Sequence, residues 1–410
     1  MLAAARLEPT QHDVRAARRS EKLPRGTMSR PKLTPAQCAT LLALALQIAG
    51  CAAQSPVVQA TPSRMTPTLT SALTPINPAR AAAPAAAESG SAPSGGGAEN
   101  KGTISTRPTP VRGAAIGSHS PFAIASGLDG AIWFTEYQGD GIGRISPYGA
   151  LVRFKLDEEG FAERLCAGPD GAIWFSDTEG NRIGRLAPDQ KLAYIDLPHD
   201  DSGPAGIVAG PGDYLYFSEH AGDRIGRIDP KTANLVEFRL PKGAGPGEMV
   251  EGSDHNLWVA EDHGNRIARV RPNGSHKEFA IQTPGAKPGN LVLGPGGDVW
   301  FTELGTDKVG KITPDGAITE YVLPERGVPF GIAAGSDGNL WVTMARSHSI
   351  VRVTPDGATT SFATGPTTLA GFITAGPDGN LWFTEPNGKI GKMTTSGHIT
   401  EFVVAKLGTP

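Results

Sequence analysis

Six carboxylate side chains recur at one fixed offset from a repeated aromatic residue, and no other pattern in the chain has clearer chemical potential. Each stands three residues after a Trp or Tyr, and a seventh corresponding position holds methionine. The seven positions are Glu136, Asp177, Glu219, Glu261, Glu303, Met344 and Glu385. Gathered on one face, such carboxylates could hold a hard cation such as Mg²⁺ or transfer protons.

A structural role for these carboxylates is the competing interpretation. In most repeats the next segment opens with a basic residue, namely Arg182, Arg224, Arg266, Lys308 and Lys389. Ion pairing within each repeat would explain the pattern without chemistry, and such pairs contribute only about 0.2 to 1 kcal/mol each. A second basic set, present in all seven repeats, is interpreted as structural too: Arg144, Arg185, Arg227, Arg269, Lys311, Arg352 and Lys392.

Function is expected where the repeat breaks. One repeat replaces the carboxylate by Met344 and continues with Arg346 and His348. Another places Glu163 and Arg164 where the other repeats have small or aromatic residues. Two further histidines, His220 and His263, are interpreted as solvated loop residues.

The aromatic anchors define a repeat of 41 or 42 residues. They are Trp133, Trp174, Tyr216, Trp258, Trp300, Trp341 and Trp382. This period is typical of the four-stranded blade of a β-propeller. The content of 53 Gly and 35 Pro fits many short strands joined by turns. The sequence therefore predicts an all-β fold, a seven-bladed β-propeller of four-stranded blades, over residues 111–410.

Each repeat unit supplies four short strands. In one unit, GVPFGIAAG is expected to form the innermost strand, LWVTM the second, HSIVRV the third and ATTSFAT the outermost. Gly and Ala dominate the innermost strands because seven of them converge on a narrow axis. All seven units are complete up to residue 405, so the ring can close without borrowing a strand. Residues 102–109 are candidates for an added edge strand.

The repeat unit resembles the streptogramin B lyases, also called virginiamycin B lyases, over about residues 119–405. The resemblance rests on the pattern GPDG-x-hydrophobic-WFTE followed by NRIGRI and PDG-x-ITEY. It implies a seven-bladed propeller that, with Mg²⁺, opens cyclic depsipeptide antibiotics by elimination across the ester C–O bond. Such a reaction needs a base for the α-proton and a cation for the developing enolate.

This sequence departs from the family pattern at the residues that carry the chemistry. The resemblance implies histidines after the opening residue of the sixth and seventh inner strands, but Phe330 and Gly371 stand there. Leu369 occupies the place of a glutamate, and Phe122 that of a tyrosine. The candidate ligand-binding residues are Glu163, Arg164, Glu303, Phe330, Met344, Arg346, His348 and Glu385, with Glu303 and Glu385 as candidate Mg²⁺ ligands.

The N-terminal region reads as a secretory signal. Residues 28–50 contain two basic residues followed by the apolar run ATLLALALQIAG, and the ending Ile-Ala-Gly before Cys51 resembles a bacterial lipobox. We expect Cys51 to be lipidated and residues 1–27 to be a non-native extension. An ordinary secretory signal with a chance cysteine is the alternative. A transmembrane span is disfavoured, because the run is shorter than the roughly 20 residues that a bilayer requires.

Residues 51–110 are predicted to form a disordered tether. The segment is rich in Pro, Ala, Ser and Gly and nearly free of large apolar side chains, so it cannot bury enough surface to order itself. Removal of residues 1–50 moves the net charge from −3 to −8. An acidic chain is not expected to bind nucleic acid. We expect a monomer anchored by lipid to the cell envelope, in the periplasm or at the outer membrane.

Two functions remain open at this point. One is an envelope lipoprotein whose propeller face binds a peptide-like, glycan or protein ligand. The other is a Mg²⁺-dependent C–O lyase, or a lactone-cleaving enzyme, that has diverged from the family. The missing histidines favour binding.

The lipid anchor can be tested at a single residue. Replacement Cys51→Ala removes the thiol that would receive the lipid, so the protein is expected to become soluble or to remain unprocessed. Membrane fractionation with immunoblotting would reveal this change. Normal processing and unchanged membrane association of the variant would contradict the lipobox interpretation.

Overall fold

Each repeat folds into four antiparallel strands joined in sequence order, as its alternating pattern predicts. The computed structural model describes residues 100–101, 104–107, 120–137, 141–156 and 160–404. Glycines with positive φ, such as Gly130 (73°) and Gly338 (73°), form the tight turn between the first two strands of a blade. The predicted all-β, seven-bladed propeller is confirmed.

The first four blades contain strands β3 to β18. Blade 1 consists of β3 (Ser120–Ser126), β4 (Ile132–Tyr137), β5 (Gly141–Ile145) and β6 (Leu151–Lys155). Blade 2 consists of β7 (Ala162–Ala167), β8 (Ile173–Asp177), β9 (Arg182–Leu186) and β10 (Leu192–Asp196). Blade 3 consists of β11 (Pro204–Gly210), β12 (Tyr214–Glu219), β13 (Arg224–Ile228) and β14 (Asn234–Arg239). Blade 4 consists of β15 (Pro246–Glu251), β16 (Leu257–Glu261), β17 (Arg266–Val270) and β18 (His276–Ala280).

The last three blades contain strands β19 to β30. Blade 5 consists of β19 (Pro288–Leu293), β20 (Val299–Glu303), β21 (Lys308–Ile312) and β22 (Ile318–Val322), with a 3₁₀ turn, η1 (Pro295–Gly297), between the first two strands. Blade 6 consists of β23 (Pro329–Ala334), β24 (Leu340–Met344), β25 (Ser349–Val353) and β26 (Thr359–Ala363). Blade 7 consists of β27 (Ile373–Ala375), β28 (Leu381–Glu385), β29 (Lys389–Met393) and β30 (Ile399–Val403). Among the described residues there is no helix long and apolar enough to cross a membrane.

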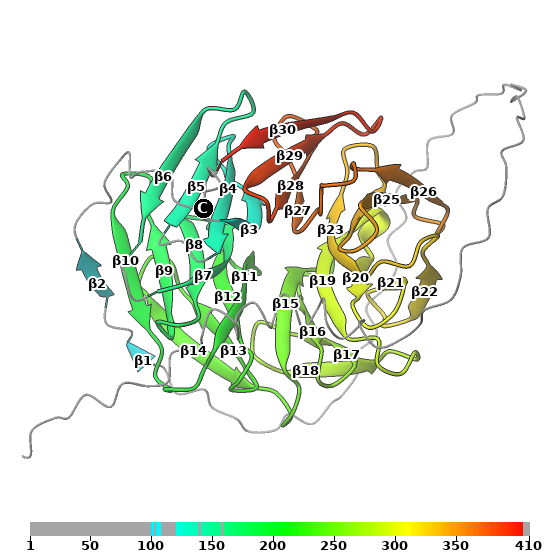
Figure 1. Cartoon of the computed structure of the whole chain (residues 1–410). Helices are drawn as coiled ribbons and strands as arrows, with labels where there is room; N and C mark the ends of the chain where they lie inside the picture. Colours follow the sequence, from blue (N-terminus) through cyan, green and yellow to red (C-terminus); the bar gives the residue numbers. More distant parts are fainter. Residues whose placement is uncertain (1–99, 102–103, 108–119, 138–140, 157–159, 405–410) are drawn as a thin grey trace, which may run out of the picture.

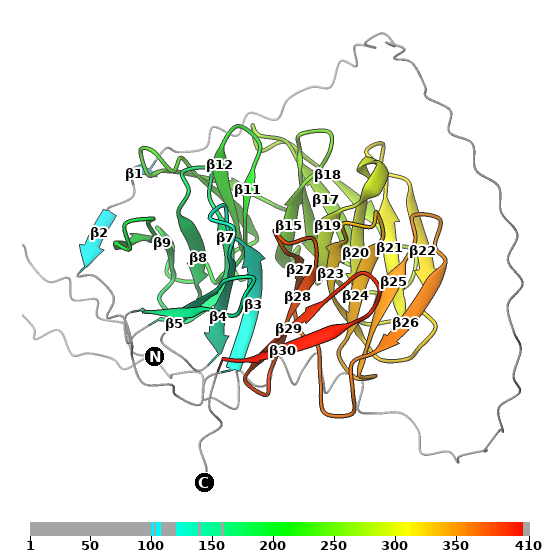
Figure 2. The ribbon, with the colours of Figure 1, turned by 90° about the horizontal axis from the view of Figure 1, so that it is seen from above.

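The seven inner strands surround one axis, and the ring closes between blades 7 and 1 (Figures 1 and 2). Each inner strand contacts the inner strand of the next blade, and β27 contacts β3. Trp382 of blade 7 packs with Ile132 and Phe134 of blade 1. Each blade keeps its own four consecutive strands. Side-chain packing therefore closes the ring, and the expectation that no strand is borrowed is confirmed.

Aromatic side chains of the second strands fill the wedges between blades. Trp174 packs against blade 3, whereas the adjacent Phe175 packs against blade 1, because successive strand residues point to opposite faces. The Phe ring needs space on the third strand. A Cβ atom at Gly184, the cross-strand partner of Phe175, would lie 2.0 Å from the ring. The glycine of the Arg-Ile-Gly-Arg motif thus makes room for the ring.

Blades 4 and 6 lack this Phe and compensate on the facing strand. Val259 lies opposite Ala268 in blade 4, and Val342 lies opposite Val351 in blade 6. All four side chains are fully buried. A smaller residue on the second strand is thus matched by a larger one on the third, which keeps the wedge filled.

The half-buried residues of the second basic set lie beside the Trp anchors in six blades. In six blades the cation lies 5.3 to 6.0 Å from the centroid of its own Trp ring. The Trp ring N–H donates to an aspartate of the preceding turn in five blades, as in Trp133 to Asp129 at 3.1 Å. The structural interpretation of this basic set is confirmed.

Two short strands precede the propeller proper. Strand β1 (Asn100–Lys101) pairs with β14 of blade 3, and β2 (Ile104–Arg107) pairs with β10 of blade 2. Both segments lie within the predicted tether, residues 51–110, and the structure pairs them with the outer edges of two blades. The expected added edge strand is therefore present at the edge of blade 2. The Cys51 anchor, the signal segment and most of the tether lie outside the described residues.

Candidate functional site

One end of the central axis brings inner and second strands together. The first residue of an inner strand pairs with the last residue of the second strand, as Pro288 does with Glu303 and Pro329 with Met344. The next residue of each inner strand begins a β-bulge in six blades. We call this end the axial mouth, defined by the residues Phe122, Glu163, Ala205, Gly247, Gly289, Phe330 and Gly371.

Hydroxyl groups fix the backbone of the axial mouth. Thr302 accepts a hydrogen bond from the amide of Asn290 at 3.1 Å and donates one to the carbonyl of Phe330 in the next blade at 2.9 Å. Thr343 likewise donates to the carbonyl of Gly371 at 2.6 Å. Each hydroxyl ties the bulge of its own blade to the adjacent blade. The scaffold therefore places the Cα atoms at the mouth without using their side chains.

Five aromatic rings form a continuous cluster at the axial mouth. Phe330 lies 4.7 Å from Phe372, and Phe372 lies 5.3 Å from Phe122, measured between ring centroids. Phe122 is 5.8 Å from both Tyr137 and Phe161. Phe330 and Phe372 are buried, whereas the other three rings are partly exposed. This aromatic cluster spans blades 6, 7, 1 and 2 and presents ring faces and edges to the solvent.

A charged pair lies beside the aromatic cluster. The guanidinium of Arg164 pairs with Glu248 of blade 4 and lies 4.2 Å from the ring centroid of Phe372 and 5.2 Å from that of Phe122. Both charged side chains remain partly exposed, at 18% and 22%. Arg164 and Glu248 also line a cavity of about 120 Å³ to which all seven blades contribute, including Asn290 of blade 5. The mouth therefore combines aromatic surface, a cation and a carboxylate.

The other residues at which the repeat pattern is interrupted do not all lie at the mouth. The carboxylate of Glu163 accepts a hydrogen bond from Thr178 at 2.6 Å, at the mouth beside Arg164. Met344 is fully buried among apolar residues between blades 5 and 6. Arg346 and His348 lie in the following turn at the rim, where His348 Nδ1 is 3.0 Å from the carbonyl of Thr368. Glu163, Arg164 and Phe330 are thus brought together, whereas Met344 is separate from them.

The second-strand carboxylates point sideways between blades. Glu303 shares a strand face with Phe301, which packs against Trp258 of blade 4. Glu385 shares a face with Phe383, which packs against Trp341 of blade 6. Both glutamates are fully buried. They lie in different grooves between blades, so the structure does not bring Glu303 and Glu385 together around one Mg²⁺ ion.

In several blades the buried carboxylate belongs to a row of acid, base and acid across three strands. Arg266 is 3.1 Å from Glu261 on the second strand and 2.9 Å from Glu278 on the fourth. Asp177 with Arg182 (2.6 Å) and Glu219 with Arg224 (2.9 Å) form the pairs expected from the sequence. In blade 7, Lys389 instead bonds Glu401 of the fourth strand. The expected pairing is confirmed for Asp177, Glu219 and Glu261, whereas Lys308 and Lys389 pair with fourth-strand glutamates.

Two acids share one base in such a row, and burial raises the pKa of the acid on the second strand or, in blade 3, on the fourth. Removal from water, together with the nearby charge of Glu278, raises the pKa of Glu261 to about 7. The pKa of Glu385 is also raised to about 7, by burial and by the charge of Glu401. Burial raises the pKa of Glu237 and Glu303 as well. In each of these rows, the pKa of one glutamate is raised.

A histidine and aspartate cluster lies on the rim between blades 3 and 4. His220 Nε2 is 3.3 Å from Asp262 Oδ1, and the ring centroids of His220 and His263 are 4.9 Å apart. Hydrogen bonding to Asp262 raises the pKa of His220. Among the described residues, these three form a group whose potential ligand atoms lie within 4.8 Å of one another. The interpretation of His220 and His263 as solvated loop residues missed this arrangement.

Sequence analysis also missed Phe372, Phe161 and Glu248 as members of the mouth. The available signal was the residue that follows each mouth-defining residue. At that position three blades have the small residues Ala123, Gly206 and Gly331, whereas the other four have Arg164, Glu248, Asn290 and Phe372. A large or charged residue at a position that crowds the axis marks a break in the repeat.

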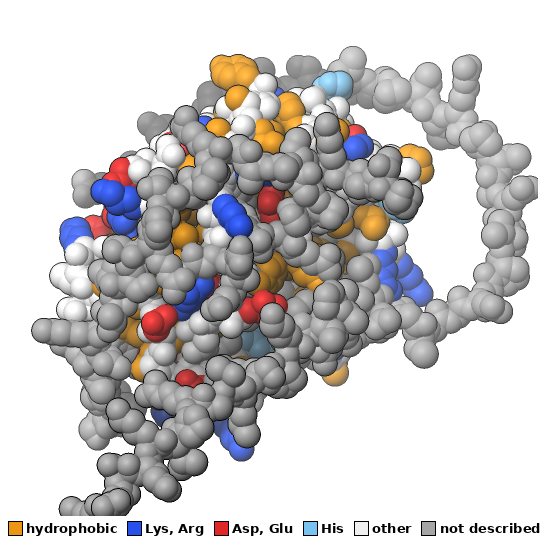
Figure 3. Space-filling model, turned by 60° about the vertical axis from the view of Figure 1, so that its left-hand side comes forward, with side chains coloured by type: hydrophobic (Ala, Val, Ile, Leu, Met, Phe, Trp, Pro, Cys, Tyr) orange, Lys and Arg blue, Asp and Glu red, His pale blue; other side chains and the backbone are white. Residues whose placement is uncertain are grey.

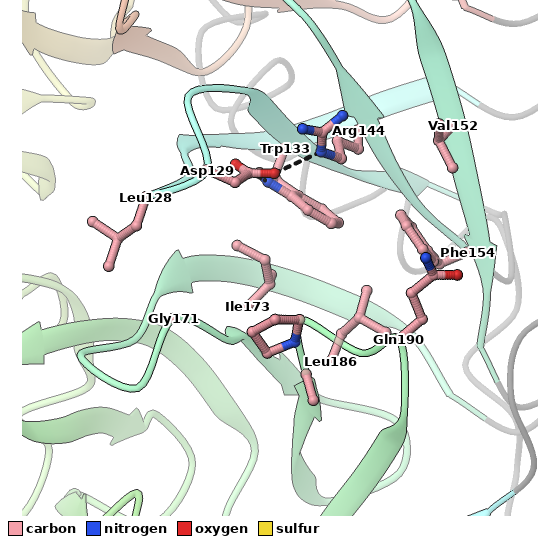
Figure 4. Close-up of a pocket in the computed structure, with 12 residues that line it drawn as sticks. Leu128, Asp129, Trp133, Arg144, Val152, Phe154, Gly171, Ile173, Leu186 and Gln190 are labelled. Carbon is pink, nitrogen blue, oxygen red and sulfur yellow. Dashed lines mark hydrogen bonds and ion pairs between the residues drawn. The ribbon is translucent and has the colours of Figure 1, made fainter.

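Two larger grooves lie at the opposite end of the blades. Figure 4 shows the groove between blades 1 and 2, of about 370 Å³, where Arg144 pairs with Asp129 at 2.6 Å beside Trp133. The other lies between blades 2 and 3 and has about 560 Å³. Both grooves are lined by residues at repeat positions, so we interpret them as gaps that follow from blade packing. On the side shown in Figure 3, acidic and basic side chains are interspersed.

Comparisons with known proteins agree on one family. The sequence model described as the virginiamycin B lyase family matches residues 96–247 and 234–409. A catalytically inactive histidine-to-alanine variant of the virginiamycin B lyase from Staphylococcus aureus, solved with quinupristin, is 30% identical with a TM-score of 0.65, and the match covers 71% of this chain and 99% of that chain. A streptogramin B lyase structure is also 30% identical, with a TM-score of 0.65 over 73% of this chain and 98% of that chain.

More distant structures share the fold alone. Hydrazine synthase from Kuenenia stuttgartiensis is 14% identical, with a TM-score of 0.55 over 71% of this chain and 97% of that chain. The search of curated proteins gave no match.

The acid, base and acid rows predict a pH-dependent stability. A glutamate whose pKa rises from 4.5 to about 7 on folding binds more protons in the folded than in the unfolded state between those pH values. Its contribution to the free energy of unfolding is therefore lost as the pH rises through that window. Thermal melting should show a lower midpoint at about pH 8 than at about pH 5.5.

Variant Glu261→Gln should reduce this pH dependence, because the amide does not titrate. Replacement of the exposed Glu179 by Gln is the matched control and should leave the dependence unchanged. Equal slopes for the Glu261 variant and the wild type would contradict the assignment.

Proposed function

This chain belongs to the virginiamycin B lyase family, and we propose that it is a binding protein that holds a peptide-like ligand at the axial mouth without eliminating it. One observation carries the proposal. At the two positions where the resemblance implies histidines, this chain has Phe330, whose ring packs into the aromatic cluster, and Gly371, which has no side chain. The base that elimination requires is absent from both positions.

The chemistry of the axial mouth supports a ligand with both apolar and polar parts. Partly exposed rings of Phe122, Tyr137 and Phe161 offer faces and edges for aromatic or aliphatic groups. Arg164 and Glu248 offer a cation and a carboxylate for the polar groups of a peptide backbone. A cyclic or otherwise constrained peptide fits this combination, since it loses little entropy on binding.

A related protein supports the separation of binding from catalysis. The inactive variant of the Staphylococcus aureus lyase lacks one histidine and was nevertheless solved with quinupristin. Loss of a histidine side chain is therefore compatible with a bound ligand in that protein.

The Mg²⁺ ion that the resemblance implies does not enter the proposal. Glu385, the second-strand carboxylate of blade 7, is buried between blades 6 and 7, and Glu303 is buried two blades away. The two carboxylates do not fit a shared ion, and we derive no step through one.

The proposed location follows from the sequence. A lipid on Cys51 would attach the chain to the cell envelope, and the segment between Cys51 and β1 would separate the propeller from the bilayer. A peptide-like ligand would then be met outside the cytoplasm.

Elimination can be tested directly with quinupristin. Incubation of the purified protein with quinupristin and Mg²⁺ should yield no linear product, because a missing general base costs roughly 10² to 10⁴ in rate. Elimination leaves the mass unchanged, so chromatographic separation or fragmentation must distinguish the linear form. A linear product that disappears when a chelator is added would overturn the proposal and identify a Mg²⁺-dependent lyase.

Binding has a separate test at Phe122. Calorimetric titration with quinupristin as the probe should show binding by the wild type and affinity about tenfold weaker for Phe122→Ala, which removes one face of the aromatic cluster. The matched control is Phe402→Ala. Phe402 is also partly exposed, but it lies in the outermost strand of blade 7, away from the mouth, where its ring stacks on Trp382. Absence of binding by the wild type, or equal losses in the two variants, would contradict an aromatic binding site at the mouth.

A further inference from the structure

We propose that His220, Asp262 and His263 bind one divalent transition-metal ion of the zinc type on the rim between blades 3 and 4. This proposal does not rest on the aromatic cluster or on the proposed peptide binding. It uses two nitrogen ligands and one oxygen ligand, the donor set that zinc accepts and that Mg²⁺, which prefers oxygen, does not.

The geometry of the cluster suits a small ion. One ligand atom from each residue lies within 4.8 Å of the others, so a central ion can be reached by small side-chain rotations. Asp262 Oδ1 already lies between the two rings, 3.3 Å from His220 Nε2 and 4.0 Å from His263 Nε2. All three side chains keep solvent access, with exposed fractions of 36%, 38% and 60% for His220, Asp262 and His263.

The surrounding loops hold these side chains together. Asp223 accepts hydrogen bonds from the amides of Gly243 (2.8 Å) and Gly245 (3.0 Å), which fixes the loop before β15. Gly245 has φ of 58°, and a Cβ atom there would lie 2.6 Å from His263 Nδ1. The absence of a side chain at Gly245 therefore leaves the space that the ring of His263 occupies.

The backbone also orients the other two ligands. The amide of His220 donates to the carbonyl of Gly203 at 3.1 Å, and the amide of His263 donates to Asp262 Oδ1 at 2.7 Å. Asp262 Oδ1 thus belongs to a formed turn before any ion arrives. Glu163 lies close enough to interact electrostatically with His220, which adds negative charge beside a cation.

His220 and Asp262 stand at a repeat position that holds neither histidine nor a carboxylate in the other blades. The position directly after the second-strand carboxylate holds His220 in blade 3 and Asp262 in blade 4. In the other blades it holds Tyr137, Thr178, Leu304, Ala345 and Pro386. Blade construction therefore does not require His220 or Asp262. With three protein ligands, the ion would keep a coordination position open for water or for a ligand group.

Metal titration tests the site. The full-length chain, purified without a histidine tag and treated with a chelator, is titrated with Zn²⁺ in a calorimeter. We expect about one ion per chain at this site and no competition from excess Mg²⁺. Co²⁺ as a spectroscopic probe should give visible absorption bands of a site with low coordination number.

Variants His220→Ala and His263→Ala should each weaken Zn²⁺ binding by more than about tenfold and remove the Co²⁺ bands. Asp262→Asn keeps the shape of the side chain and should weaken binding as well. The matched control is His255→Ala, because His255 also lies beside a carboxylate, 3.0 Å from Glu251, at the opposite end of blade 4. Absence of Zn²⁺ binding by the wild type, or unchanged binding by the His220 and His263 variants, would overturn the proposal whatever the outcome with quinupristin.

Discussion

A ring of seven blades requires that every wedge between neighbours be filled to the same depth, and the second strands meet this requirement. Each sends Trp or Tyr toward the following blade and, in five blades, Phe toward the preceding one. The glycine opposite Phe134 or Phe301 lets the ring lie flat on the third strand. In blade 6, Val342 replaces the ring and Val351 replaces the glycine opposite it, so the space between the blades stays filled. Closure between Trp382 and Phe134 uses the same packing as every other interface.

This packing separates scaffold from chemistry at the axial mouth. The bridging hydroxyls of Thr302 and Thr343 come from second strands and bond backbone groups of the inner strands. The side chains at Phe330 and Gly371 do not support the ring in this way. Such a position can change from a base to an aromatic ring while the Cα atoms stay in place. The aromatic cluster lies mainly at the start of the inner strands, whereas the rim histidines stand just after the second strands.

The sequence predicted the fold well because the repeat is nearly constant and each blade is local. The spacing of the Trp anchors was sufficient to count blades and to place their strands. The direction of the carboxylates was predictable too, since Glu303 stands two residues after Phe301 and shares its face. The aromatic cluster was harder, because Phe122 and Phe372 are far apart in the chain and meet only through ring closure. The pairing of β2 with β10 has no counterpart in the repeat, so the repeat could not place it.

The route of the chain into the propeller has a mechanical consequence. Coming from the N-terminus, β1 pairs with the outermost strand of blade 3 and β2 with that of blade 2, before β3 starts blade 1 at the axis. A pull on the N-terminal segment therefore acts first on the two residue pairs between β1 and β14, and then on the four between β2 and β10. The interface of blades 7 and 1 is loaded only after those pairs separate. The two short strands thus place six backbone residue pairs between the N-terminal segment and the point at which the ring closes.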